Sequence, residues 1–390
     1  MHPRAIWAIG CGQLVNWGVL FFAYGILLIP LQDAFGAPRW LIAGAFSVGL
    51  LVSAIAAPAV GRLADRGQGP AVMQAGGLFA AALLIFWALL PSIATTYFVW
   101  AVLGLCMAGI LYEPVFVIVG RAFSDADQRL RAIATVTVTG GLASTVFFPG
   151  TAALVTRFGW RETVVILGAV IAATTLIVGR FAFRDRAWSA ATIREAILDS
   201  GGAAKSSERL PGIGRMVFIF ALSIIVNSAV SSNLVAALID RGLAPTFAAT
   251  VAGTFGVMQL PGRVLLLNAR IAPRPGPLLI GSFALQIAGL IALMFQGTLA
   301  MWSGVMLFAS GAGLTTLGRP YLVLDAYGVD RAGRANGVIA RGQQLARAAG
   351  PVTAAAAGGA LGYTTVFAVL TAMLVAATLM TRTRAMTPPN

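Results

Sequence analysis

Five ionisable side chains lie inside long apolar stretches of this 390-residue chain, where charges are rare. One is acidic and four are basic: Glu113, Arg263, Arg319, Arg341 and Arg347. A charge inside a bilayer costs at least about 2.5–3.5 kcal/mol, so each one needs a partner, water or a function. Because a guanidinium group binds a carboxylate or phosphate through two parallel hydrogen bonds, the surplus of arginine favours an anionic ligand.

The four arginines differ in how well they suit such a ligand. Arg347 lies about ten residues into its apolar stretch, or about 15 Å deep, and is the first candidate to bind the acidic group. Arg319 is the second candidate. Arg341 lies one turn inside its stretch and is expected to extend towards the membrane surface. Arg263 is as well suited to packing or gating as to binding.

Glu113 is the only acid inside these stretches, and therefore the one group there that could carry a proton. It lies eight residues before Arg121, about 12 Å from the end of its stretch. Burial favours a protonated carboxyl group, whereas a neighbouring arginine favours the ionised form. An anion that occupies Arg319 would thus release Glu113 to take up a proton. A purely structural bridge between Glu113 and Arg319 is the alternative.

Uncharged polar side chains complete the candidate substrate site. Two tyrosines lie beside Pro114 and Pro320, which free backbone carbonyl groups and permit bends. They are better candidates than a third tyrosine in the first stretch. Two asparagines occupy equivalent places in the two halves of the chain, and for each of them a hydrogen bond between helices is an equally good explanation. These residues are Tyr112, Tyr321, Tyr24, Asn16 and Asn227.

The chain shows no pattern for catalysis, a metal or a cofactor. Its single histidine, His2, lies at the terminus, and no Gly-Lys-Ser/Thr loop is present to bind a nucleotide. Cys11 and Cys106 lack the spacing of a disulfide framework or zinc site, and both are expected to be buried. Gly311 and Gly313 are expected to serve close helix packing. We therefore predict a protein that is not an enzyme and needs no cofactor.

The elements that must position these residues are membrane-spanning helices. The chain is 58% hydrophobic and 10% charged, with a mean hydropathy of +0.87, whereas about a quarter of the residues in soluble domains are charged. Apolar stretches of about 20 residues, the length that crosses a bilayer, recur along the chain. They predict an all-α membrane protein with twelve transmembrane helices at 5-30, 40-60, 71-90, 96-120, 132-155, 163-180, 215-239, 246-268, 277-296, 300-323, 337-357 and 364-381.

The net charge of +14 arises mostly between the predicted spans. Of the 27 basic residues, four lie within spans; if both termini are cytoplasmic, nineteen others face the cytoplasm and only four face outward. This asymmetry predicts cytoplasmic termini in a cell (inner) membrane, in keeping with a bacterial protein, and it makes nucleic acid unnecessary as a partner. The outward residues are Arg39, Arg157, Arg161 and Arg241.

Residue patterns of the first half recur in the second half at a nearly constant offset. Val15-Asn16 recurs as Val226-Asn227, and Pro149 as Pro351. The repeat predicts two pseudo-symmetric six-helix bundles, residues 1-180 and 215-390, joined by a cytoplasmic linker over 181-214. Such repeats are typical of transporters whose bundles rock about a central site. Within the linker, Trp188 to Leu198 could form an amphipathic surface helix or belong to a simple tether.

The stretch Gly-Arg-Leu-Ala-Asp-Arg at positions 61 to 66 resembles the signature loop of the major facilitator superfamily. Together with the twelve spans, the repeat and the linker, the resemblance covers nearly the whole chain. It implies the major facilitator fold, with spans 1, 4, 7 and 10 lining a cavity in which Glu113 and Arg319 would face each other. It also implies that Gly61 allows close helix packing and that Asp65 and Arg66 pair at the cytoplasmic interface of the bundles.

Within that superfamily, the sequence is similar to the branch that carries monocarboxylates, oxalate and formate. The similarity involves the first span, at 22–25 and 30–36, and span 8, where Gln259 and Arg263 lie at the positions of that branch's Asp and substrate-binding Arg. Span 4 lacks the embedded arginine that is typical of drug/proton antiporters, since residues 102–111 carry no charge.

The resemblance implies a secondary active transporter that moves a small organic anion, a carboxylate in the simplest case, by alternating access. Transport would be coupled to protons or to exchange, and the partners would be the anionic substrate, protons and membrane lipid, with the protein acting as a monomer. Two alternatives stay open: an efflux transporter for drugs or other amphipathic compounds, and a transporter-like sensor or assembly partner.

Overall fold

The computed structural model describes residues 3–123, 125–183, 210–262 and 274–382. Within these ranges the backbone is helical apart from short connections, and they contain no strand. A helix satisfies its own backbone N–H and C=O groups, which is required where no water is present to do so. The predicted all-α architecture is confirmed.

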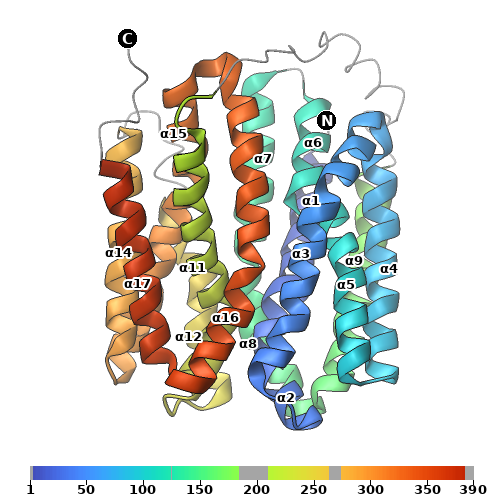
Figure 1. Cartoon of the computed structure of the whole chain (residues 1–390). Coiled ribbons are helices and arrows are strands. Elements are labelled where there is room, and N and C mark those ends of the chain that lie inside the picture. Colours follow the sequence, from blue (N-terminus) through green and yellow to red (C-terminus); the bar gives the residue numbers. More distant parts are fainter. Residues whose placement is uncertain (1–2, 124, 184–209, 263–273, 383–390) are drawn as a thin grey trace. The chain divides into compact units, whose positions relative to one another are not determined.

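The helices of the first half cover the first six predicted spans (Figure 1). Three of these spans are interrupted: α1 and α2 are separated by a π-helical segment, α5 and α6 by an extended residue, and α7 and α8 by a turn. The elements are α1 (Pro3–Trp17), a π-helical segment (Gly18–Phe22), α2 (Ala23–Phe35), α3 (Arg39–Leu63), a second π-helical segment (Ala64–Gln68), α4 (Gly69–Leu89), α5 (Ile93–Ile110), α6 (Tyr112–Ala122), α7 (Ala126–Gly141), α8 (Ala143–Phe158) and α9 (Trp160–Phe181).

The second half follows the predicted spans as well, with one helix longer than expected. The long helix carries span 300-323 and the first part of span 337-357, and it turns at Gly328, whose φ of 69° lies in the region that favours glycine. The predicted span 246-268 is described as far as residue 262. The elements are α11 (Ile213–Ile239), α12 (Pro245–Met258), α14 (Pro275–Met294), α15 (Thr298–Arg347), α16 (Ala349–Leu361) and α17 (Tyr363–Arg382).

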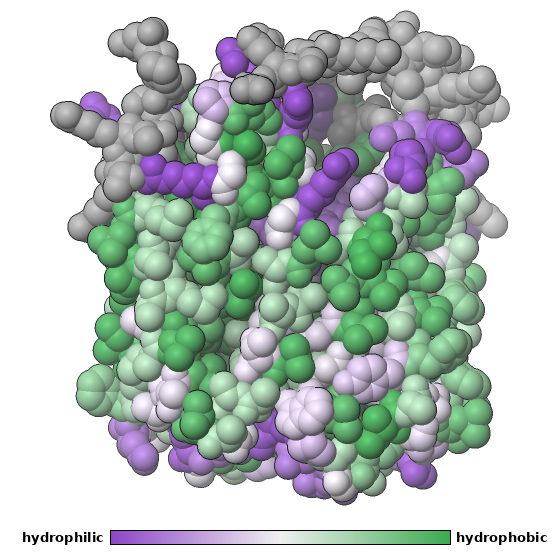
Figure 2. Space-filling view, in the orientation of Figure 1, coloured by the Kyte–Doolittle hydropathy of each residue, from purple (hydrophilic) through white to green (hydrophobic). Residues whose placement is uncertain are grey.

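The surface of these helices suits a lipid environment. Among the described residues, nine helical stretches are long and apolar enough to cross a membrane, and one of them, Arg39–Leu89, contains two predicted spans. Large apolar side chains point outward: Leu299 is 84% exposed and Leu89 is 71% exposed. In the face shown in Figure 2, hydrophobic residues cover the flank and hydrophilic residues gather at the two ends. This distribution is the one expected of a protein embedded in a bilayer.

The chain divides into two compact units. One contains Met1–Phe35 and Val48–Ser207, and the other contains Gly36–Ser47 and Glu208–Asn390. Helix α3 therefore begins in the second unit and continues in the first. A hydrogen bond holds its beginning there, because the Ser47 hydroxyl accepts from the backbone N–H of Val352 at 3.2 Å.

Aromatic side chains form much of the core of the first unit. Tyr24, Trp87 and Trp100 are fully buried, with ring centroids 4.4 Å apart for Tyr24 and Trp100 and 6.1 Å apart for the two tryptophans. The indole N–H of Trp87 donates to the Thr96 hydroxyl at 2.9 Å, so the buried donor of Trp87 is satisfied.

Glycine allows close backbone approach in both units. A Cβ atom on Gly313 would lie 2.5 Å from the Gln259 carbonyl oxygen, and one on Gly311 would collide with that of Ser282. The expectation that these two glycines serve helix packing is confirmed. In the first unit, Gly104 lies in the same way against Gly49.

The two cysteines differ, contrary to expectation. Cys106 is buried, but Cys11 is exposed. The reason is helix geometry: Cys11 follows the buried Ile9 by two residues, which places it about 200° further round α1, on the side that also carries the exposed Trp7.

Candidate functional site

Span 4 is broken directly before the candidate acid Glu113. Helix α5 ends at Ile110, Leu111 has an extended ψ of −168°, and α6 begins at Tyr112. Pro114 has no N–H group to donate to the Ile110 carbonyl, as a continuous helix would require. Helix α1 supplies the missing donors, since that carbonyl accepts hydrogen bonds from the side-chain amides of Gln13 at 2.7 Å and Asn16 at 3.2 Å.

Asn16 therefore makes an interhelical hydrogen bond, which is one of the two roles the sequence left open for it. Gln13, which the sequence analysis missed, makes the shorter bond and is fully buried. Its position one helical turn before Asn16, on the same face of α1, is the signal that could have identified it.

The break places Glu113 in the first turn of α6, where the helix dipole favours a carboxylate. The Glu113 side chain is exposed. Its neighbour Tyr112 belongs to an aromatic group, with its ring stacked on Phe116 at 5.3 Å and 5.1 Å from that of Trp17. The Tyr112 hydroxyl donates to the Thr137 carbonyl at 3.4 Å.

Gly328 divides α15 into a first arm, residues 298–327, and a second arm, residues 329–347. Arg319 is half-buried on the first arm and binds a residue of the second arm. Its guanidinium group donates to the side-chain carbonyl of Gln343, and the Gln343 amide donates to the Phe220 carbonyl on α11 at 3.4 Å. Gln343 thus orients Arg319 between two helices. The sequence analysis missed Gln343, because a glutamine in an arginine-rich helix carries no distinctive pattern.

Arg347, also half-buried, is the last residue of α15. A second proline effect occurs there: Pro351 cannot donate to the Arg347 carbonyl, and the Ser228 hydroxyl of α11 donates to it at 2.9 Å. Of the other arginines, Arg341 is exposed, as a side chain extending to the membrane surface would be, and Arg263 lies outside the described residues.

The remaining predicted polar residues lie in different settings. Asn227 and Tyr321 are half-buried, and the hydroxyl next to Asn227, on Ser228, makes the contact to the end of α15 just described. Tyr24 is 1% exposed and packs edge-on against Trp100, within the core of the first unit.

The loop between spans 2 and 3 is kinked, because its backbone leaves the helical conformation at Gly67. Asp65 and Arg66 are exposed on it, and Gly67 adopts a φ of 81° that favours glycine. The close approach implied for Gly61 is not present among the described residues, since nothing lies within 4 Å of a Cβ atom placed there. Gly69 makes such an approach instead, since a Cβ atom placed there would lie 2.7 Å from the Ile118 side chain.

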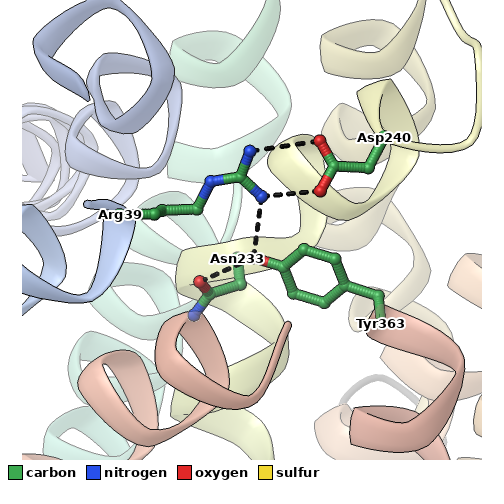
Figure 3. A network of polar contacts seen from close by, with 4 residues as sticks. All are labelled: Arg39, Asn233, Asp240 and Tyr363. Atoms are coloured by element: carbon green, nitrogen blue, oxygen red, sulfur yellow. Dashed lines mark hydrogen bonds and ion pairs between the residues drawn. The ribbon is translucent and has the colours of Figure 1, made fainter. Parts of the chain in front are cut away.

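A polar network that the sequence analysis did not identify lies in the second unit (Figure 3). Arg39, at the start of α3, binds both carboxylate oxygens of Asp240 at 2.6 and 3.1 Å and lies 3.5 Å from the Tyr363 hydroxyl. Tyr363 donates in turn to the side-chain carbonyl of Asn233 at 3.1 Å. The network therefore joins α3, α11 and α17.

Comparison with known proteins gives a family and a fold. The sequence profile of the Major Facilitator Superfamily matches residues 9–351. The human organic anion transporter MFSD10 (TETRAN) is 16% identical with a TM-score of 0.67, and the match covers 98% of this chain and 100% of that one. No curated protein sequence matches significantly.

A bacterial homolog of the human lysosomal transporter Spinster, in two inward-facing crystal structures, is also similar. The occupied form is 14% identical with a TM-score of 0.71, and the unoccupied form is 13% identical with a TM-score of 0.72. Both matches cover 98% of this chain and 97% of the other. At these identities the likeness establishes the fold, and the predicted fold class is confirmed.

Proposed function

Because this chain belongs to the Major Facilitator Superfamily, we propose that it carries a small organic anion, a carboxylate in the simplest case, across the membrane by alternating access. The family makes it a multi-pass membrane transporter for a small molecule and not an enzyme. The carboxylate and its coupling to protons or exchange are our proposal. A human protein of the same fold is named as an organic anion transporter, which supports the choice of an anion.

The observation that carries the proposal is the pair of half-buried arginines on the two arms of α15, Arg319 and Arg347. The side chain of Arg319 is oriented by Gln343, a neutral partner, and the backbone of Arg347 is held by Ser228. A guanidinium group whose orientation is fixed by an amide can bind a carboxylate through two parallel hydrogen bonds. Arg263, Tyr321 and Asn227 complete this half of the proposed site.

The other half of the proposed site carries the proton. Glu113 lies at the break of span 4 beside Tyr112, and Asn16 binds the Ile110 carbonyl at the same break. Tyr24, in the core of the same unit, belongs to this half of the proposed site. We expect Glu113 to be protonated when the anion binds and to release the proton on the far side. A carboxylate that changes charge during the cycle gains from an exposed position, which admits water and protons.

The halves that move are proposed to be residues 1-180 and 215-390, with 181-214 as a cytoplasmic linker. Asp65 and Arg66 would pair across the cytoplasmic ends in the outward-facing state, with Gly61 in the same loop. Both termini would be cytoplasmic, in the inner membrane of a bacterium, and the protein would act as a monomer.

Flux in proteoliposomes tests the proposal. Uptake of labelled mono- and dicarboxylates, with and without a pH gradient, is compared for wild type, Arg347→Ala and Glu113→Gln. Arg341→Ala is the matched control, because Arg341 lies on the same helix arm but is exposed. We expect Arg347→Ala to reduce uptake at least about tenfold, Glu113→Gln to abolish the dependence on pH, and the control to resemble wild type.

Each arm of this experiment can contradict a different part of the proposal. Equal flux in wild type and Arg347→Ala would remove Arg347 from the site. Unchanged uptake and pH dependence in Glu113→Gln would remove Glu113 from proton coupling. A wild type that moves none of the carboxylates would overturn the anion assignment.

The aromatic residues beside Glu113 favour a second candidate function. Trp17, Tyr112 and Phe116 offer large apolar faces next to an acid, and Arg319 is bridged to Gln343. This arrangement suits an amphipathic compound, as expected of an efflux transporter. Extrusion of a lipophilic cationic dye by cells that express the protein, in the absence of carboxylate flux, would establish this alternative.

A further inference from the structure

The geometry of the Arg39–Asp240 pair is the one by which arginine binds a free carboxylate. Two guanidinium nitrogens of Arg39 face the two oxygens of Asp240, at 2.6 and 3.1 Å (Figure 3). Such paired hydrogen bonds are directional as well as charged, and they select planar carboxylates. The same geometry would therefore accept a carboxylate from another molecule.

The two partners are not held equally firmly. The Arg39 side chain is 14% exposed and the Asp240 side chain 38% exposed. Arg39 also lies over the ring of Tyr363 at 5.9 Å from its centroid, and the Tyr363 hydroxyl is bound to Asn233. Asn233 is itself buried, with its amide donating to the Ala229 and Pro351 carbonyls at 3.1 and 3.2 Å. The guanidinium group is thus fixed in advance, and the carboxylate is its exposed partner.

The position of Asp240 makes its carboxylate exchangeable. Asp240 caps the C-terminal end of α11, where the helix dipole disfavours a negative charge. The ion pair with Arg39 is what compensates for this position.

A second guanidinium group lies next to the pair. Arg241 is half-buried, donates to the Thr364 hydroxyl at 3.0 Å and lies over the Phe367 ring at 5.2 Å. Burial lowers the pKa of Arg241, but a guanidinium group stays charged at neutral pH. Together, Arg39, Arg241 and Asp240 carry one surplus positive charge, which attracts anions.

We propose that Arg39 and Arg241 form an outer carboxylate site, in which Asp240 occupies the position of the substrate's carboxylate until the substrate replaces it. The inference rests on the proposed transport of a carboxylate. The positive-inside rule puts this end of the unit outside the cytoplasm, because Arg39 and Arg241 belong to the few outward basic residues. The substrate would thus be bound first at Arg39, before it reaches the arginines of α15.

The direction in which two charge-removing variants change the KM for succinate distinguishes this site from a structural ion pair. Asp240→Asn removes the competing carboxylate and should lower the KM for external succinate about threefold to tenfold. Arg39→Gln removes the receptor and should raise the KM at least about tenfold. A purely structural pair predicts the same direction in both variants, because both lose the same contact.

Ser47→Ala is the matched control, because it removes a different hydrogen bond between α3 and the rest of this unit without changing a charge. Its KM for succinate should equal that of wild type. A shift in Ser47→Ala comparable to that of Arg39→Gln would overturn the inference, as would equal shifts for Asp240→Asn and Arg39→Gln.

A binding measurement separates this inference from the proposed transport. Thermal unfolding of the purified full-length protein is followed with succinate or chloride at equal ionic strength. Succinate should raise Tm in wild type, raise it further in Asp240→Asn and have less effect in Arg39→Gln. If liposomes that contain the wild-type protein move no carboxylate but the three Tm shifts follow this order, the proposed transport is wrong and the outer site is supported. If flux occurs without this order, only the site is wrong.

Discussion

Two prolines determine where backbone atoms become available to side chains in this protein. Pro114 leaves the Ile110 carbonyl to Gln13 and Asn16, and Pro351 leaves the Arg347 carbonyl to Ser228. An unpaired carbonyl group in a bilayer costs several kcal/mol, so a polar side chain on the facing helix is required wherever a proline bends a span. In each case the bend lies beside an ionisable candidate residue.

A prediction at this scale concerns the neutral partner of Arg319. Gln343→Glu should lower the affinity for a transported anion at least about tenfold, equal to about 1.4 kcal/mol, because the new carboxylate would neutralise the guanidinium group. Gln343→Leu removes the hydrogen bond without adding charge and should change the KM less than about threefold. Substrate-dependent uptake by both variants provides the measurement.

A comparable loss of affinity in both Gln343 variants would mean that Gln343 contributes only to helix packing. A wild-type KM in Gln343→Glu would show that the charge of Arg319 does not act on the substrate.

At the scale of elements, glycine sets the distance between helices. Gly49 on α3 and Gly104 on α5 bring two backbones together: a Cβ atom on Gly49 would lie 2.7 Å from the Trp100 carbonyl oxygen, and one on Gly104 would collide with that of Gly49. In lipid the hydrophobic effect does not drive helices together, so their association depends on van der Waals packing. Small residues at the contacts allow the close approach that this packing needs.

We predict that Gly104→Ala destabilises the protein by about 1–3 kcal/mol, because backbone atoms must move to admit the methyl group. Gly150→Ala on α8 is the control: nothing lies within 4 Å of its Cβ position, and alanine favours a helix by about 1 kcal/mol over glycine. Thermal unfolding in detergent should show a lower Tm for the first variant and an equal or higher Tm for the second. Equal Tm values would mean that α3 and α5 can separate freely.

At the scale of the whole molecule, the arrangement of charge and apolar surface determines orientation in the membrane. Basic residues lie mostly between the predicted spans, on one side if both termini are cytoplasmic, and apolar residues such as Ile55 and Leu176 are exposed on the helix flanks. Since translocation of basic loops is disfavoured, both termini should lie in the cytoplasm.

Cysteine labelling in intact cells tests this orientation. In a background with Cys11 and Cys106 replaced by alanine, Gln296→Cys should react with a membrane-impermeant maleimide from outside. Gly333→Cys, which is equally exposed in the structure, should react only after the cells are permeabilised. The opposite pattern would invert the topology and place Arg39 and Arg241 in the cytoplasm.

Hydropathy and charge along the chain were sufficient to predict the all-α class and the apolar helices, and they made Glu113, Arg319 and Arg347 candidates for the site. They are sufficient because a bilayer imposes its constraint locally: each span must be apolar over its own length, whatever its neighbours are. The family signature and the repeat added the fold, which the profile match over residues 9–351 supports.

The partners of those residues could not be predicted in this way. Gln13, Gln343 and the Arg39–Asp240–Tyr363 network depend on how each helix is rotated and which neighbour it meets. Cys11 illustrates the same limit, because its exposure follows from the orientation of α1 and not from its apolar surroundings in sequence. A proline specifies that a carbonyl is freed, but only packing between helices distant in the chain selects the donor that reaches it.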